Sequence, residues 1–192
     1  MIVSRETQDR LDHFKKLVVE ENERQNLISP TSMMDFDKRH LDDALQLIEL
    51  GKPGSWCDVG SGAGLPGIVI ALATGAPMTL VEPRRLRADF LRRVVAELGI
   101  DAEVCQSKAE RVPGHFDNIT ARAVAELTKL FEITERLAQR GTRWILPKGQ
   151  SADMELAIAK ETWQGNFTLV PSRTSDTAMI VIAEGVRRRG KQ

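Results

Sequence analysis

A glycine-rich segment is the feature of this sequence that most directly suggests chemistry. Residues 58–67, here called the glycine loop, read Asp-Val-Gly-Ser-Gly-Ala-Gly-Leu-Pro-Gly. Because glycine has no Cβ, its backbone can turn sharply and approach a ligand closely. Such a loop is typical of a site for a nucleotide-type cofactor. The alternative is an ordinary glycine-rich turn between a strand and a helix.

The spacing of the glycines bears on which cofactor the loop binds. Residues 62–67 formally match the Gly-x-Gly-x-x-Gly fingerprint of dinucleotide-binding proteins. The preceding strand is expected to end near Val59, however, so Gly60 should be the first glycine of the motif. Counted from Gly60, the fingerprint fails because Leu65 stands where the third glycine belongs.

Two acidic residues favour S-adenosylmethionine as the cofactor. Asp58 precedes the first glycine, where its carboxylate would repel a pyrophosphate but suits the positively charged amino acid end of S-adenosylmethionine. Glu82 ends the next expected strand, where a carboxylate can accept hydrogen bonds from both ribose hydroxyls. The residues that this pattern predicts to bind the methyl donor are Asp58, Gly60, Gly62, Gly64 and Glu82. An NAD(P)-dependent oxidoreductase remains the alternative.

Several motifs for methyl acceptors are missing from the chain. Residues 120–123 read Thr-Ala-Arg-Ala, where enzymes acting on exocyclic base amines usually carry an Asn/Asp-Pro-Pro-aromatic loop. Methylation of a pyrimidine at carbon 5 needs an activated thiolate, whereas Cys57 and Cys105 lie within expected strands as small core residues. Guanine N7 has a free lone pair, so its methylation needs positioning rather than a general base. The lack of catalytic motifs fits that acceptor.

The charge distribution suggests where RNA would bind. The chain has 27 basic and 27 acidic residues, so contacts to phosphates must come from local clusters. Two such clusters exist, one at the start of an expected helix and one at the C-terminus. The residues predicted to contact RNA are Arg84, Arg85, Arg87, Arg187, Arg188, Arg189 and Lys191. With 5% aromatic residues and no tyrosine, stacking platforms for single-stranded bases are poorly supported.

Alternating strands and helices are expected to position these residues. Strands are predicted at 55–59, 78–81, 102–106, 118–121 and 143–146, and helices at 68–73, 84–98, 125–140 and 152–163. Two late strands, 168–171 and 178–183, have no helix between them and could be antiparallel. Helices at 5–24, 31–40 and 42–50 precede the first strand. The pattern predicts a mostly parallel sheet covered on both faces, with ligands at the carboxyl ends of its strands.

The length of 192 residues fits one domain. We expect a helical extension over 1–51, a Rossmann-like core over 52–186 and a basic tail over 187–192. No apolar run approaches 18 residues, and the N-terminus lacks the apolar core of a signal peptide. The cysteines and histidines show no metal-ligand spacing. A cytoplasmic, metal-free monomer that does not bind membranes is the expectation.

Motifs along nearly the whole chain resemble one known family. They are Asn26-Leu27, Arg39-His40-x-x-Asp43, the glycine loop with its Leu-Pro-Gly end, Leu80-Val81-Glu82, Phe90-Leu91, Ala109-Glu110, the Thr-Ala-Arg-Ala-Val of 120–124, and Lys148-Gly149. The chain therefore resembles the bacterial 16S rRNA guanine-N7 methyltransferases, the RsmG or GidB family. The resemblance implies a class I S-adenosylmethionine-dependent methyltransferase fold, Rossmann-like, with a seven-stranded and mostly parallel sheet.

The resemblance also implies roles for individual residues in holding the methyl donor. Gly60 and Leu65 would contact the donor, and Glu82 would hold its ribose. Ala109 and Glu110, just past the third strand, match the family's adenine-contacting pair. Arg122, at the end of the fourth strand, matches an arginine at the donor pocket.

The acceptor side implied by the resemblance has no certain catalytic residue, since the methyl group would move by direct displacement. The candidates for positioning the guanine are Arg122, Lys148 and His40, with His40 and Lys148 bordering the cleft that the base enters. The implied substrate is 16S rRNA, in the small ribosomal subunit or an assembly intermediate, with position 527 of that RNA as the expected target. Besides a methyltransferase and an NAD(P)-dependent oxidoreductase, a third interpretation of the sequence is an RNA-binding protein with a vestigial cofactor site.

Overall fold

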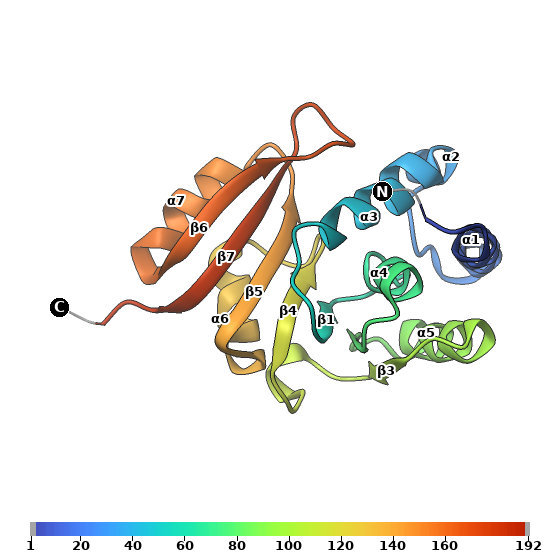
Figure 1. Ribbon diagram of the computed structural model, residues 1–192, viewed down its shortest axis with the longest axis horizontal. Coiled ribbons are helices and arrows are strands. Elements are labelled where there is room, and N and C mark those ends of the chain that lie inside the picture. Colours follow the sequence, from blue (N-terminus) through green and yellow to red (C-terminus); the bar gives the residue numbers. More distant parts are fainter. Residues whose placement is uncertain (1–2, 191–192) are drawn as a thin grey trace.

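Seven strands form one sheet in the order β3-β2-β1-β4-β5-β7-β6, in a computed structural model that describes residues 3–190 (Figure 1). The strands are β1 (Trp56–Val59), β2 (Met78–Val81), β3 (Ala102–Cys105), β4 (Phe116–Ala121), β5 (Ala138–Lys148), β6 (Trp163–Pro171) and β7 (Met179–Arg188). Strands β1 to β5 are parallel, whereas β7 is antiparallel to both of its neighbours. The strand order reverses beside β1, which places the switch point of the sheet at the glycine loop.

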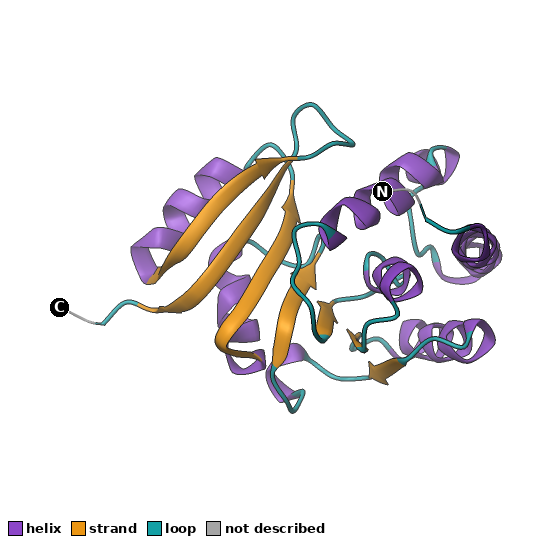
Figure 2. Ribbon diagram, in the orientation of Figure 1, coloured by secondary structure: helices purple, strands orange, loops and turns teal. Residues whose placement is uncertain are grey.

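Helices cover both faces of the sheet (Figure 2). The helices are α1 (Arg5–Gln25), α2 (Pro30–Met34), α3 (Asp43–Ile48), α4 (Gly67–Thr74), α5 (Arg85–Leu98), α6 (Leu127–Thr134) and α7 (Ala152–Thr162). A π-helical segment, Asp37–Asp42, leads directly into α3. Helices α4 and α5 lie on one face with α1 packed against them, and α6 and α7 lie on the other. No helix within residues 3–190 is long and apolar enough to cross a membrane.

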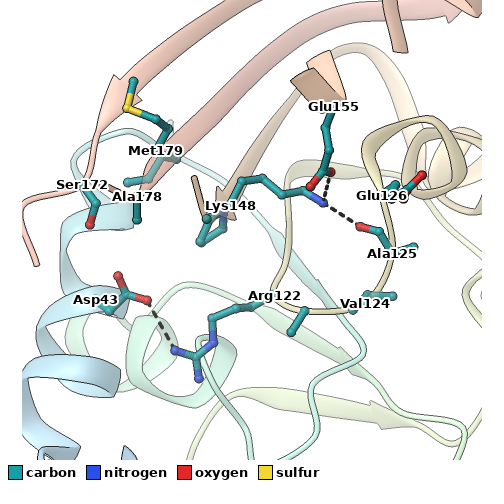
Figure 3. Close-up of a pocket in the computed structure, with 14 residues that line it drawn as sticks. Asp43, Arg122, Val124, Ala125, Glu126, Lys148, Glu155, Ser172, Ala178 and Met179 are labelled. Carbon is teal, nitrogen blue, oxygen red and sulfur yellow. Dashed lines mark hydrogen bonds and ion pairs between the residues drawn. The ribbon is translucent and has the colours of Figure 1, made fainter. Parts of the chain in front are cut away.

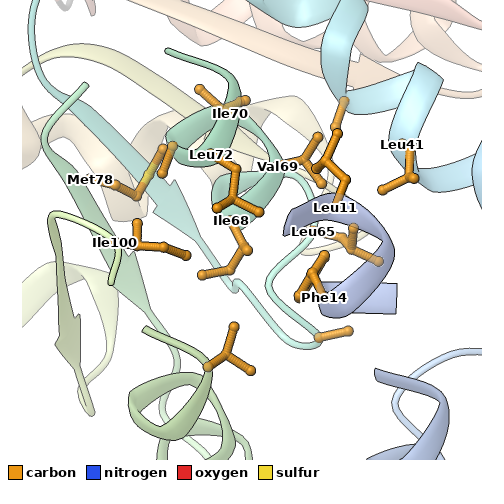
Figure 4. Packing of buried hydrophobic residues seen from close by; sticks show 14 of the residues in the cluster. Leu11, Phe14, Leu41, Leu65, Ile68, Val69, Ile70, Leu72, Met78 and Ile100 are labelled. Atoms are coloured by element: carbon orange, nitrogen blue, oxygen red, sulfur yellow. The ribbon is translucent and has the colours of Figure 1, made fainter. Parts of the chain in front are cut away.

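The hydrophobic core consists of one cluster on each face of the sheet. In β5, Ile145 belongs to the first cluster, whereas Trp144 and Leu146 belong to the second, because successive side chains of a strand point to opposite faces. In α1, Leu11 and Phe14 join the first cluster, and Figure 4 shows them beside the glycine-loop end and α4. The N-terminal helices therefore pack directly against the element that positions the glycine loop.

The structure confirms the mostly parallel sheet and the antiparallel pair at its end, but the expected C-terminal end of one helix is wrong. Helix α6 ends at Thr134, so residues 138–140 of the expected helix 125–140 belong to β5. Ala138 pairs with Phe116, and the Thr142 hydroxyl donates a hydrogen bond to the Phe116 carbonyl at 2.6 Å. Pairing with β4 outweighs the helical pattern of this segment.

The expected helix 31–40 is also different, since it is divided into two short pieces. Ser29 caps α2, and its hydroxyl accepts a hydrogen bond from the Ser32 amide. Pro30 then occupies the first helical position, as its fixed φ favours. The π-helical segment follows and carries His40 into the interior.

The boundary of the expected basic tail at residue 187 is wrong. Strand β7 continues through Arg188, which pairs with Trp163 of β6. The Arg188 guanidinium lies 4.8 Å from the ring centroid of Trp163 and forms ion pairs with Glu132 and Glu135 at 3.7 and 3.5 Å. Lys191, which was also expected to contact RNA, lies outside the described residues.

Candidate functional site

The glycine loop turns away from the end of β1 through residues with left-handed backbone conformation. Gly60 has φ +72° and Gly62 has φ +54°, values that residues with a Cβ rarely adopt. A Cβ on Gly62 would meet no atom closer than 3.8 Å. The loop therefore presents bare backbone toward open space at this point, which suits close approach of a ligand.

Asp58 lies beneath the glycine loop and is fully buried. Its Oδ2 accepts a hydrogen bond from the Gly67 amide at 3.1 Å, so the carboxylate joins the two ends of the loop. Its Oδ1 is buried and has no hydrogen-bond partner among the described residues. Burial raises the pKa of Asp58 to about 6, against the opposing effect of the Gly67 hydrogen bond. The spare oxygen is an acceptor that suits the positively charged end of the methyl donor.

Glu82 lies at the end of β2 and is oriented by two backbone amides. Its Oε2 accepts a hydrogen bond from the Gly62 amide at 3.0 Å, and its Oε1 accepts one from the Arg84 amide at 2.9 Å. The residue is 4% exposed. Each carboxylate oxygen keeps a second acceptor position, so the pair can still accept from two neighbouring hydroxyls. The carboxylate and the open space before Gly62 fit the ribose of the donor.

The other residues expected to contact the donor, Leu65, Ala109 and Glu110, differ in how exposed they are. A 3₁₀ turn, Ala109–Arg111, follows β3 at the same edge of the sheet as Glu82. Ala109 is buried there and Glu110 is exposed. The side chain of Leu65 is buried in the first hydrophobic cluster (Figure 4), so its backbone is the part that the loop leaves for a ligand.

A cavity of about 510 Å³ adjoins the carboxyl ends of β4 and β5 (Figure 3). Its wall includes residues 122–126, which we call the connecting segment because they join β4 to α6. Asp43 from α3 and Lys148 from β5 also line it. We call this space the acceptor cavity, since the connecting segment that lines it also contacts the glycine loop at Gly60.

The connecting segment touches the glycine loop as well as the acceptor cavity. The Cγ2 of Val124 lies 2.5 Å from the position that a Cβ on Gly60 would occupy. Ala123, between Val124 and Arg122, has φ +56°, an uncommon conformation for a residue other than glycine. Val124 was not predicted to be functional from the sequence, because no local pattern places it against Gly60.

Arg122 connects the acceptor cavity to the N-terminal helices. Its guanidinium donates hydrogen bonds to the Arg39 carbonyl at 3.1 Å and to His40 Nδ1 at 3.1 Å, and it lies 3.4 Å from Asp43 Oδ2 (Figure 3). Asp43 Oδ1 in turn accepts a hydrogen bond from the Thr174 hydroxyl at 2.8 Å. Asp43 stands in the Arg-His-x-x-Asp motif but was not assigned a role from the sequence.

His40 does not border the acceptor cavity, contrary to expectation. It is buried, with its ring edge-on to Phe36 and its Nδ1 facing Arg122. Burial, together with the charges of Arg122 and Arg39, lowers its pKa to about 4. The ring is therefore neutral near neutral pH. Since Nδ1 accepts from Arg122, Nε2 carries the hydrogen, and it has no partner within residues 3–190.

Lys148 lines the acceptor cavity as expected, but its ammonium group is engaged. It donates a hydrogen bond to the Ala125 carbonyl at 2.6 Å and forms an ion pair with Glu155 at 2.8 Å (Figure 3). Its side chain is 11% exposed. Glu155 was not predicted to be functional from the sequence, because it lies on α7 with no motif around it.

Neither cysteine offers a thiolate at this site. Burial, and secondarily the charge of Asp58, raises the pKa of Cys57 well above its ordinary value. Cys105 is partly exposed rather than buried, and burial and Glu103 raise its pKa too. Both thiols therefore stay protonated near neutral pH, which agrees with the absence of a cysteine nucleophile.

The arginines predicted to contact RNA differ in whether their side chains are paired within the protein. No hydrogen bond or ion pair from the side chains of Arg84, Arg85 or Arg87 is found within the described chain, whereas Arg188 is paired as described above. Arg87 Nη1 lies 3.8 Å from the Cβ position of Gly62, so the α5 cluster flanks the glycine loop. Arg189 uses its Nε to donate to the Trp163 carbonyl at 3.3 Å. The free positive charge thus lies mainly at the start of α5.

Comparison with known proteins agrees with this geometry. The sequence profile described as GidB, rRNA small subunit methyltransferase G, matches residues 7–175. The chain is 42% identical over 190 residues to the ribosomal RNA small subunit methyltransferase G of Sphingopyxis alaskensis, covering 95% of this chain and 82% of that protein. It is 41% identical over 196 residues to the protein of that name from Rhizorhabdus wittichii, covering 98% and 90%.

A solved structure shares the fold at low sequence identity. A SAM-dependent methyltransferase from Aquifex aeolicus superimposes with a TM-score of 0.62 at 16% identity, covering 83% of this chain and 95% of that one. The fold is therefore that of the class I methyltransferases, as expected from the seven-stranded sheet.

Proposed function

The chain belongs to the GidB family, rRNA small subunit methyltransferase G, and we propose that it transfers a methyl group from S-adenosylmethionine to N7 of a guanine in 16S rRNA. The observation that carries the proposal is the adjacency of two sites at one edge of the sheet. One is the glycine loop with Glu82, and the other is the acceptor cavity. The connecting segment contacts both.

The residues of the loop fit S-adenosylmethionine, which supplies an electrophilic methyl group when bound. Glu82 accepts hydrogen bonds from the ribose hydroxyls, because its two oxygens are already oriented by the amides of Gly62 and Arg84. Asp58 offers its spare buried oxygen toward the positively charged amino acid end. Ala109 and Glu110 border the adenine, in keeping with the family resemblance.

The acceptor cavity positions the guanine without removing a proton from it. N7 carries a free lone pair, so the base needs only to be held in line with the methyl group. The neutral His40 agrees with this, since a group with a pKa of about 4 is not suited to general base catalysis near neutral pH. Arg122 lies at the cavity wall, oriented by the Arg39 carbonyl and Asp43.

The RNA is bound outside the cavity by the unpaired arginines at the start of α5. Arg84, Arg85 and Arg87 contact phosphates next to the glycine loop, and Arg187 adds a more distant contact. The protein acts in the cytoplasm as a monomer, on 16S rRNA within the small subunit or an assembly intermediate. The relatives are methyltransferases, so an NAD(P)-dependent oxidoreductase is not favoured.

The test is a methylation assay with labelled S-adenosylmethionine on 16S rRNA and on small subunits that lack N7 methylation. Methylated guanine is located by borohydride reduction and aniline cleavage, which breaks the chain at N7-methylguanine. We expect one cleavage site that requires both enzyme and donor. Label found at another base atom would refute the N7 assignment. Separate calorimetric titrations with S-adenosylhomocysteine and NADH should give binding of the first alone, whereas a vestigial cofactor site would bind neither.

A further inference from the structure

The connecting segment has little structure of its own to hold it. Residues 122–126 form no helix or strand, yet they lie between the glycine loop and the acceptor cavity. Ala123 has a left-handed φ of +56°, and the Val124 side chain lies against the position that a Cβ on Gly60 would occupy. A segment with such a backbone keeps its conformation only where its surroundings impose it. The contacts that impose it therefore determine how donor and acceptor meet.

Two side chains from other elements hold the C-terminal half of this segment. Lys148 of β5 donates to the Ala125 carbonyl at 2.6 Å, and Glu155 of α7 accepts from the Leu127 amide at 3.2 Å. The two side chains are joined to each other by the 2.8 Å ion pair. The Ser151 hydroxyl donates to the other carboxylate oxygen of Glu155 at 2.9 Å. The ion pair between Lys148 and Glu155 therefore acts as one unit that holds the segment.

The position of Glu155 distinguishes it from a residue that acts on substrate. Both of its oxygens are used within the protein, one by Ser151 and the other by Lys148 and the Leu127 amide. Burial alone would raise the pKa of Glu155, but the hydrogen bonds from Lys148 and Ser151 lower it overall, so the carboxylate is ionised near neutral pH. Its charge in turn directs the Lys148 ammonium toward the segment rather than into the cavity.

We propose that Glu155 is a positioning residue for the methyl transfer, acting through Lys148 and the Leu127 amide to hold residues 122–126 between the methyl donor and the guanine. This inference rests on the proposed function and deepens it. It also assigns Lys148 to the same task, in place of direct contact with the base. Removal of either member releases the same segment.

The experiment compares Glu155→Gln, Lys148→Met and the double variant with the wild type. Glu161→Gln is the matched control, because Glu161 lies exposed on the same helix and its side chain has no hydrogen bond or ion pair in the described chain. A displacement of about 1 Å at a reacting centre can cost up to about a hundredfold in rate, so we expect kcat to fall about ten- to a hundredfold in each single variant. KM for RNA should change little, because the arginines of α5 are untouched.

The double variant should be no slower than the slower single variant, since the two residues act as one unit. A Glu155→Gln enzyme with the kcat of the wild type, beside a Lys148→Met enzyme that has lost activity, would show that Lys148 acts directly on the base and would overturn the inference. Multiplicative losses in the double variant would overturn it too.

Hydrogen exchange provides a readout that does not depend on activity. In Glu155→Gln and Lys148→Met, amides of residues 123–127 should exchange faster than in the wild type and in Glu161→Gln, with the β1 and β4 amides unchanged. Unchanged exchange at 123–127 in both folded variants would refute the inference even if no rRNA is methylated. If the wild type fails to methylate 16S rRNA while these amides respond as expected, the proposed function fails and the positioning of the segment stands.

Discussion

The carboxylate of Glu82 accepts the amide hydrogen of Gly62 at 3.0 Å, although the two residues come from different turns of the chain. The residue that we propose to bind the ribose thus also fixes the glycine loop. Under this proposal, donor binding and loop conformation are linked through one side chain. A substitution at Glu82 would remove the proposed ligand contact and, at the same time, leave the Gly62 amide without its acceptor.

Replacement of Glu82 by alanine should weaken binding of S-adenosylhomocysteine by about 1–3 kcal/mol, the loss expected for charge-assisted hydrogen bonds to hydroxyls. Calorimetry at neutral pH gives the dissociation constant. Asp101→Ala serves as the control, because Asp101 is exposed at the opposite end of the β3 strand. Equal affinity in the Glu82 variant and the wild type would mean that the ribose is held elsewhere.

Replacement of Gly60 by alanine should abolish donor binding. The added Cβ would lie 2.5 Å from Val124 Cγ2, so either the loop or the connecting segment must move. Gly75→Ala is the matched control, since Gly75 has a similar φ of +67° but no atom within 4 Å of its Cβ position. Both variants should lose about 1–2 kcal/mol of stability from the left-handed backbone, measured by urea unfolding. Normal donor affinity in Gly60→Ala would contradict the prediction.

The buried Asp58 should make stability depend on pH with a definite sign. Its pKa in the folded protein is about 6, above the ordinary 3.8, so the folded state favours the protonated carboxyl. The associated stability is present below about pH 4 and is lost as the pH rises through about 6. Asp58→Asn cannot ionise. Its free energy of unfolding, relative to the wild type, should therefore rise by about 3 kcal/mol between about pH 3 and pH 7.

Urea unfolding of both proteins across this range checks the prediction. His40 contributes in the opposite direction, because its pKa is lowered to about 4 and its stability contribution is lost as the pH falls. Both proteins contain His40, so its effect cancels in the difference between them. A difference that stays constant with pH would show that Asp58 titrates normally.

Substitution of Arg85 or Arg87 by glutamine should weaken RNA binding and reduce its salt dependence. Each lost phosphate contact should flatten the slope of log K against log salt by about 0.7–0.9. Arg92→Gln is the control, since Arg92 is on the same helix but pairs with Asp89 at 2.8 Å. Filter binding at several salt concentrations gives the slopes. Affinity for S-adenosylhomocysteine should be unchanged in Arg85→Gln, and an unaltered salt slope would exclude this part of α5 from the RNA interface.

Much of the fold was predictable because its signals are local. The helices expected at 5–24 and 84–98 match α1 and α5 closely, and Gly99, with φ +58°, ends α5. The alternation of strands and helices predicted the parallel sheet. The exceptions were segments in which pairing with a strand distant in the sequence outweighed the local sequence pattern. Residues 138–140 were predicted as helix but belong to β5, where Ala138 pairs with Phe116 of β4, and Arg188 was predicted as tail but pairs with β6.

The sequence by itself determined where the residues that we propose to bind the donor lie, because Asp58, the glycines and Glu82 are at the ends of adjacent parallel strands that finish at the same edge of the sheet. Only the tertiary structure decided the acceptor side. Val124 meets Gly60, and Arg122 meets Asp43, across 64 and 79 positions of the chain. Local backbone conformation and apolar periodicity depend on residues that are neighbours in the sequence. Which partner a charged side chain meets depends instead on how whole helices and strands pack together. That is why the engagement of Lys148 by Glu155 appeared only once β5 and α7 were in place.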